Sequence, residues 1–164
     1  MSRRILRAAG VAALLAIAAL VGAVVDPTPP ARGEPSVAAD ARETTTRANW
    51  RVIDGDTFED LGTGDRYRLE NIDTPETGSR ARCAAERALG DRATQRARAI
   101  IAGADQVDVR RTGRIDRYNR IIAFFSVDGR DLGEWMVAEG LARPWRGRRE
   151  AWCDAQGNLV AFGN

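Results

Sequence analysis

The chain has 164 residues, and its 25 basic residues, all Arg, nearly balance 23 acidic ones; it contains two Cys and no His. The missing His excludes Ser-His-Asp triads, His general bases and His-ligated zinc sites. Two cysteines are too few for a zinc finger or an iron–sulfur cluster, so any catalysis must use carboxylates, Arg, hydroxyls or a metal bound by oxygen.

The N-terminus predicts an export element. A basic stretch, "MSRRILR", precedes an apolar run without a charge at residues 8–25, which is the order of regions in a signal peptide. The run is also about long enough to span a bilayer. Residues 1–25 are therefore either a cleaved signal peptide or an uncleaved anchor that attaches the protein to the membrane. We expect an exported protein, either secreted, periplasmic or anchored in the cell envelope, and the choice between the Sec and Tat routes stays open.

Residues 26–48 are rich in Pro, Ala and small polar residues, which predicts a flexible linker. Residues 49–164 can form one domain with a single core, which we expect to be monomeric. This domain carries 19 Arg and 19 acidic residues, so its charge alone does not indicate a polyanion partner. The Arg clusters at 110–120 and 143–149 are either contacts for a polyanion or ordinary solvated surface.

The domain is predicted to contain five short strands. Alternating or continuous apolar residues mark them, and the turn signals "GTG" and "DG" each follow a predicted strand. The strands lie in residues 49–61 (two strands, divided at Gly55), 65–72, 106–110 and 120–127.

Two helices are predicted between and after these strands. Apolar residues at helical spacing mark residues 83–104, with Gly90 as a start or a kink. Asp131 and Glu134 have the spacing of a capping box for the second helix, and the tail has room for a third, short helix. This order predicts the α+β class and favours a five-stranded OB-fold-type β-barrel with two or three helices, although other α+β folds are compatible with it.

Four carboxylates lie where the predicted strands end. Asp54 and Asp56 flank a glycine, and residues two apart on a strand share a face. Asp73 and Glu76 follow the third strand on either side of a Thr-Pro pair. Such carboxylates repel each other unless a hard cation or Arg neutralises them, and an all-oxygen ligand set favours Ca²⁺ or Mg²⁺ over zinc or copper.

Two arginines are candidates for the same place. Arg68 precedes Asp73 by an odd number of residues, so a bend or bulge must intervene if both are to serve one site. Arg120 ends the motif "DRYNR". Taken alone, each is an ordinary surface residue. Together, however, a metal, two guanidinium groups and a carboxylate that directs water are what phosphodiester hydrolysis requires.

Four motifs in this order and spacing, "VIDGDTF", "RLENIDTPE", "DRYNR" and "VDGRDLGEWMVAEGLAR", resemble the staphylococcal nuclease (thermonuclease-like) family over about residues 50–145. The resemblance implies a five-stranded OB-type barrel and a Ca²⁺-dependent phosphodiesterase that acts on DNA and RNA. It places Asp56 and Asp73 at the metal carboxylates, Thr74 where a backbone carbonyl binds the metal, and Asp54 at an outer-shell carboxylate.

The same resemblance assigns the remaining roles. Glu76 falls at the general base, and Arg68 and Arg120 at the two phosphate-binding arginines. Arg117 and Tyr118 are then expected to contact the substrate. The chain departs from the family in two places. Asn119 replaces a glycine, although Asn tolerates left-handed backbone, and "PWRGRR" replaces the tyrosines that border the nucleotide pocket of the staphylococcal enzyme, which leaves base preference open.

Two further expectations carry alternatives. Two cysteines in a chain expected to be exported predict a disulfide between Cys83 and Cys153, against the alternative of two unpaired thiols. For function, the alternative to a nuclease is a non-catalytic module of the same fold that binds nucleic acid or protein. The retained base and metal carboxylates favour the enzyme, because a binding module needs neither.

Overall fold

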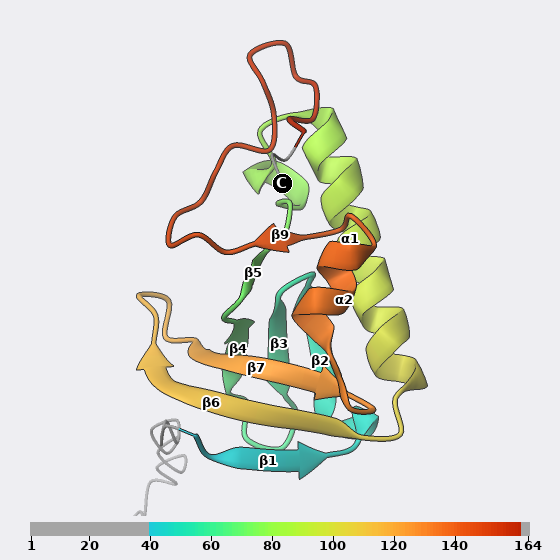
Figure 1. The fold of residues 1–164 in the computed structure, drawn as a ribbon, viewed down its shortest axis with the longest axis vertical. Helices are drawn as coiled ribbons and strands as arrows, with labels where there is room; N and C mark the ends of the chain where they lie inside the picture. The colour runs from blue at the N-terminus through green and yellow to red at the C-terminus, as the bar shows by residue number, and fades with distance from the viewer. Residues whose placement is uncertain (1–39, 162–164) are drawn as a thin grey trace, which may run out of the picture. The chain divides into compact units, whose positions relative to one another are not determined.

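The computed structural model describes residues 40–161, which form an α+β fold with a strongly curved sheet and two α-helices (Figure 1). The five predicted strands are present, in an OB-type arrangement, and they lie next to each other in the order β6-β7-β4-β3-β2. All neighbours are antiparallel except β4 and β7, which are parallel. The elements of this sheet core are β2 (Trp50–Asp54), β3 (Thr57–Asp60), β4 (Arg66–Leu69), β6 (Val107–Ile115) and β7 (Ile121–Val127).

Three shorter strands and an additional edge strand complete the sheets. The edge strand, β1 (Arg42–Thr45), pairs with β6. The shorter strands are β8 (Arg130–Asp131), which pairs with β7, and β5 (Ile72–Asp73) and β9 (Arg143–Pro144), which pair with each other. The β5–β9 pair draws the C-terminal part of the chain towards the end of β4 (Figure 1).

The flexible-linker prediction is wrong for its last residues. Residues 42–45 belong to the predicted linker 26–48, yet they form β1. Thr45 in this strand accepts a hydrogen bond of 2.6 Å from the indole N–H of Trp50, a core residue. The buried indole thereby gains the acceptor that it needs. The predicted signal segment 1–25 and the rest of the linker up to residue 39 lie outside the described residues.

The two helices lie close to the predicted positions. Helix α1 (Ala84–Gly103) packs an apolar face on β2, and α2 (Leu132–Ala138) begins at Asp131, whose carboxylate accepts the Glu134 N–H at 2.8 Å. The tail up to residue 161 contains no third α-helix; the remaining helical turns are the 3₁₀ segments Arg47–Asn49 and Gly78–Arg80. Within residues 40–161, neither helix is long and apolar enough to cross a bilayer.

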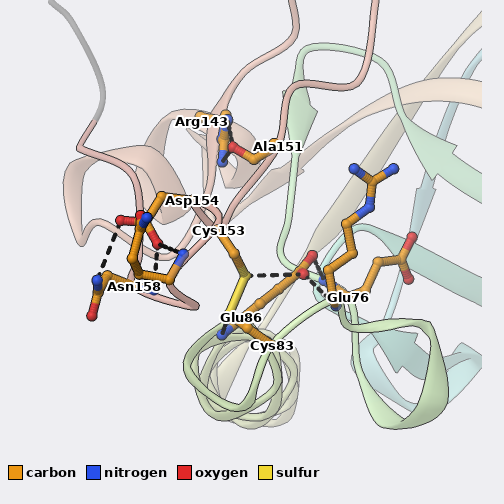
Figure 2. The surroundings of a disulfide bond; sticks show 10 residues. Glu76, Cys83, Glu86, Arg143, Ala151, Cys153, Asp154 and Asn158 are labelled. Atoms are coloured by element: carbon orange, nitrogen blue, oxygen red, sulfur yellow. Dashed lines mark hydrogen bonds between the residues drawn. A yellow bond between two sulfur atoms is a disulfide. The ribbon is translucent and has the colours of Figure 1, made fainter.

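A disulfide fixes the start of α1. Cys83 is the N-cap residue of α1, and its sulfur accepts the Glu86 N–H at 3.2 Å. The same cysteine is joined to Cys153, the pairing that the sequence analysis expects (Figure 2). The C-terminal segment is thus attached to the N-terminal end of α1.

The core lies between the curved sheet and α1. Its centre is a group of aromatic rings with centroids 4.9–5.9 Å apart, a spacing at which edge-to-face and offset contacts stabilise a core. These rings belong to Trp50, Phe58, Tyr67 and Phe125. They anchor β2, β3, β4 and β7, the strands whose ends carry the predicted site.

Candidate active site

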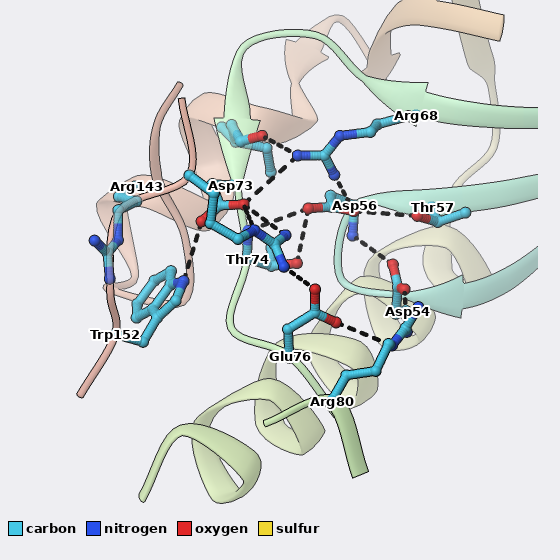
Figure 3. Close-up of polar contacts among 12 residues, drawn as sticks. Asp54, Asp56, Thr57, Arg68, Asp73, Thr74, Glu76, Arg80, Arg143 and Trp152 are labelled. Carbon is cyan, nitrogen blue, oxygen red and sulfur yellow. Dashed lines mark hydrogen bonds and ion pairs between the residues drawn. The ribbon is translucent and has the colours of Figure 1, made fainter. Parts of the chain in front are cut away.

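The predicted carboxylates meet where the β2–β3 turn approaches β5 (Figure 3). Asp56 is 3% exposed, and its Oδ2 accepts the backbone N–H and the hydroxyl of Thr74 at 3.1 and 3.0 Å. The glycine in this turn permits the approach, because a Cβ on Gly55 would lie 2.9 Å from the Thr74 Cγ2. The turn at Gly55 therefore brings Asp56 against Thr74, the residue that follows β5.

Arg68 joins two of these carboxylates. Its Nη1 lies 2.5 Å from Asp56 Oδ1 and its Nη2 lies 3.6 Å from Asp73 Oδ1, while Nη2 also donates to the Ile72 carbonyl at 3.2 Å. The bend that the odd spacing of Arg68 and Asp73 requires is present, because β4 ends at Leu69 and β5 begins only at Ile72. Both carboxylates therefore face one guanidinium group.

The charges of the site depend on each other. Burial opposes ionisation of Asp56, but the charge and hydrogen bonds of Arg68 and the hydrogen bonds from Thr74 outweigh it and hold the pKa of Asp56 below its usual value. Burial raises the pKa of Asp54, and the neighbouring charge of Asp56 raises it further. Burial also works against the charge of Arg68, yet Asp56 and Asp73 raise its pKa overall, so this guanidinium stays positive.

Glu76 lies beside this group and is held through both its side chain and its backbone. Arg80 Nε is 3.1 Å from Glu76 Oε2, and Arg80 Nη2 also lies 3.3 Å from Asp54. The Glu76 N–H donates at 3.2 Å to Glu86, a buried residue of α1. A Cβ on Gly90 would come within 2.5 Å of the Glu76 carbonyl oxygen. Gly90, predicted as a helix start or kink, instead allows α1 to pack directly on the segment that carries Glu76.

Sequence reasoning missed three side chains of the site. Arg149 donates from Nη2 and Nε to Asp73 Oδ1 at 2.8 and 3.1 Å, and it also forms an ion pair with Glu76. The Trp152 indole donates to Asp73 Oδ2 at 3.0 Å. Arg80 is the third. Two sequence features point to this part of the chain, namely the Arg cluster 143–149 and the expected pairing of Cys153. Neither of them identifies which arginine contacts the site carboxylates.

Arg120 reaches the site from the β6–β7 hairpin. Its Nη1 donates to the Thr57 hydroxyl at 3.1 Å, and that hydroxyl donates to Asp56 at 3.1 Å. Asn119 has a φ of 59°, so the left-handed backbone expected at the position of the family glycine is present. Arg120 is therefore aimed at Asp56, with one hydroxyl between them.

The two predicted substrate contacts lie farther out on the same hairpin. Arg117 donates to the Tyr118 hydroxyl at 2.8 Å, and Tyr118 is largely exposed. The Arg120 guanidinium carbon lies 5.3 Å from the centre of the Tyr118 ring. Within residues 40–161, the contacts of Arg117 and Tyr118 lead to the site through Arg120.

The donor set fits a hard cation in kind, because Asp54, Asp56 and Asp73 supply only oxygen. Within residues 40–161, no three His, Cys, Asp or Glu side chains are close enough together to hold a metal ion. Arg68 and Arg149 supply the positive charge between the carboxylates. A cation shared by Asp56 and Asp73 would therefore compete with these guanidinium groups.

The chain is similar to a known protein family and to two named endonucleases. The family model described as "Staphylococcal nuclease homologue" matches residues 66–159. The chain is 35% identical over 96 residues to "Endonuclease YncB" of Bacillus subtilis (strain 168), a match that covers 57% of this chain and 44% of that protein. It is also 35% identical over 96 residues to "SPbeta prophage-derived endonuclease YokF" of the same organism, covering 57% of this chain and 32% of the relative. The match spans less than half the length of either relative.

Proposed function

Because the chain belongs to the staphylococcal nuclease family, we propose that it is a nuclease that hydrolyses phosphodiester bonds of DNA, RNA or both. The observation that carries the proposal is the Asp56–Arg68–Asp73 group, with Glu76 held beside it by Arg80. A binding module has no use for two buried carboxylates and a third one aligned next to them. The endonuclease names of both relatives support the same reaction class.

The proposed roles follow from what each group can do. Arg68 and Arg120 approach Asp56 from two directions, one directly and one through Thr57, so a phosphate at Asp56 could accept hydrogen bonds from both. Planar guanidinium groups suit phosphate oxygens and stabilise the charge that develops during attack. Glu76, a partly buried carboxylate flanked by Arg80 and Arg149, takes the proton from the attacking water.

Ca²⁺ is the proposed metal ion, held by Asp56, Asp73 and the Thr74 carbonyl, with Asp54 as an outer carboxylate. When bound, the ion would supply positive charge to the phosphate and help to orient water. Asp56 and Asp73 are suited to it because they are buried and offer only oxygen, and the ion would compete with Arg68 for both carboxylates.

We also propose that the protein is exported, on the strength of the basic and apolar order of residues 1–25. The Cys83–Cys153 disulfide is in keeping with an oxidising compartment.

The test is digestion of plasmid DNA and of a structured RNA by the full chain with Ca²⁺, with EGTA, and with Ca²⁺ restored. We expect cleavage that EGTA abolishes and Ca²⁺ restores. Asp73→Asn should weaken the response to Ca²⁺, so that more ion is needed for the same rate. Retained binding of an oligonucleotide without cleavage in Ca²⁺, Mg²⁺ or Mn²⁺ would contradict the proposal and assign a binding module instead.

A further inference from the structure

The segment 145–153, here called the C-terminal strap, is fastened at both ends beside the active site. At its start, the Trp145 N–H donates to the Asn71 carbonyl at 2.8 Å, continuing the β5–β9 pairing. At its end, Cys153 is bonded to Cys83 at the start of α1. The strap therefore passes over the site with little freedom to leave it.

Two strap residues point into the site, and their partners are the predicted functional carboxylates. Both ion pairs of Arg149 within the described part of the chain are with Asp73 and Glu76. Trp152 is 1% exposed and donates to the other oxygen of Asp73. The strap thus contacts the proposed metal ligand and the proposed base at the same time.

The positive charge of Arg149 reduces the repulsion among the carboxylates of the site. Four carboxylates, those of Asp54, Asp56, Asp73 and Glu76, are linked here through shared arginine partners, and neighbouring like charges repel. Arg68 forms ion pairs with Asp56 and Asp73, and Arg80 forms ion pairs with Asp54 and Glu76. Arg149 joins the two pairs, because it forms ion pairs with both Asp73 and Glu76.

The disulfide links the strap to the element that positions Glu76. Cys83 starts α1, and Glu86 in the first turn of α1 accepts the Glu76 N–H. The sulfur of Cys153 lies 3.6 Å from the Glu86 carboxylate (Figure 2). Loss of the disulfide would free the end of the strap next to the backbone that orients Glu76.

We propose that Arg149 is a third arginine of the active site, a positioning residue that holds Glu76 and Asp73 in one arrangement, and that the Cys83–Cys153 disulfide keeps it in place. This inference rests on the proposed nuclease activity. A base displaced by about 1 Å can lower turnover about 10²-fold, so the geometry predicts a large effect on kcat and a small one on KM.

The experiment compares Arg149→Ala with Arg148→Ala, measuring kcat and KM on a fluorescent oligonucleotide with Ca²⁺. Arg148 is a matched control, because it is the neighbouring strap residue, its side chain is 82% exposed, and its nearest acidic partner is Glu150. We expect Arg149→Ala to lower kcat about 10²-fold and Arg148→Ala to leave it within twofold. Methylguanidinium in the buffer should restore part of the activity of Arg149→Ala. The unfolding free energies of Arg149→Ala and Arg148→Ala should be alike.

A double-mutant cycle tests the role of the disulfide. Cys83→Ser with Cys153→Ser should lower kcat strongly, and adding Arg149→Ala to it should cost little more, because both changes remove the same contact. If the wild-type protein is active and Arg149→Ala keeps full turnover, this inference is wrong while the proposed function stands. The same holds if the losses of kcat from Arg149→Ala and from the cysteine replacements are fully additive, or if the loss of activity only follows a loss of stability. A wild-type protein that cleaves neither DNA nor RNA would contradict the proposed function itself.

Discussion

Asp116 illustrates how a single carboxylate sets the direction of an active-site arginine. It accepts the N–H groups of Tyr118 and Arg120 at 2.8 and 3.0 Å, and the Arg120 side chain donates to it at 2.8 Å. Burial opposes its ionisation, but the hydrogen bonds and charge of Arg120 hold the pKa of Asp116 below its usual value. The ionised Asp116 carboxylate therefore contributes both to the stability of the fold and to the orientation of the Arg120 side chain.

Asp116→Asn should therefore lower both turnover and stability. Because the pKa of Asp116 is lower in the folded protein, its ionised form stabilises the fold above the unfolded pKa, and this contribution is lost as pH falls through the folded pKa. We expect an unfolding free energy lower by about 1–2 kcal/mol at pH 7, with the difference from wild type shrinking as pH falls through the acid range in which Asp116 becomes protonated. Urea unfolding across this range measures it, with Asp91→Asn on the exposed face of α1 as control. A difference that stays constant with pH would contradict the assignment.

Residue by residue, the sequence predicted the side chains that belong to local motifs. Asp54, Asp56 and Asp73 could be expected near one another, because Asp54 and Asp73 lie at or just after the ends of predicted strands and Asp56 follows the turn at Gly55. Arg149 and Trp152 could not, since their approach to Asp73 depends on the course of a strap that has no periodic pattern and is fixed by pairing with β5 and by a distant cysteine. Contacts between residues more than 70 positions apart leave no local signal in one sequence.

The segment that follows β5 packs directly on helix α1. Gly90 in the middle of this helix is costly for helix stability, since Ala would be favoured by about 1 kcal/mol. It is explained by contact, because the Pro75 and Glu76 carbonyl oxygens would lie 2.7 and 2.5 Å from a Cβ at this position. Glycine at this position lowers the intrinsic stability of the helix, but it allows the backbone of Glu76 to pack directly on α1.

Gly90→Ala should accordingly reduce activity although it improves helix propensity. The new methyl group must push the Pro75–Glu76 backbone away from α1, so we expect kcat to fall at least about tenfold through displacement of the base. Gly103→Ala, in the last position of the same helix with nothing within 4 Å of its Cβ, is the matched control and should leave kcat unchanged. Equal activity in both variants would show that the close packing at Gly90 does not position Glu76.

The element boundaries show where sequence patterns are informative. The five sheet strands and both helices carry apolar patterns and were predicted within a few residues, except that β6 continues to Ile115, five residues beyond the predicted end. Strand β1 was not predicted, because its residues, "RETT", alternate between exposed and partly exposed positions and contribute no buried apolar side chain. The strands β5, β8 and β9 have two residues each, too few for any periodic signal.

Across the whole molecule, the disulfide closes the longest covalent loop of the domain. Cys83 and Cys153 are 70 residues apart, and the loop includes β6, β7 and α2. In the chain-entropy account, a cross-link over such a loop stabilises the fold by about 4 kcal/mol, since the unfolded chain loses freedom. The expectation of export and the presence of two cysteines were enough to predict this pairing, whereas its place beside the candidate site required the fold.

Replacing both cysteines with Ser should lower the unfolding free energy by about 2–4 kcal/mol. The denaturant dependence should also steepen, because an unfolded chain without the cross-link exposes more surface. Urea unfolding of the oxidised wild type and of the double variant measures both quantities. Identical midpoints and slopes for the two proteins would show that the bond contributes nothing to the stability of the fold.

The most direct test of the account is Glu76→Gln, measured as single-turnover cleavage and as binding of the same oligonucleotide with Ca²⁺ present. The amide keeps the size of Glu76 but cannot take a proton from water, so we expect the rate to fall by about 10²- to 10⁴-fold while affinity changes little. Glu139→Gln, at the exposed ion pair with Arg96, should cleave like wild type. A Glu76→Gln protein that binds the ion and the oligonucleotide and still cleaves at the wild-type rate would contradict the role of Glu76 as the base.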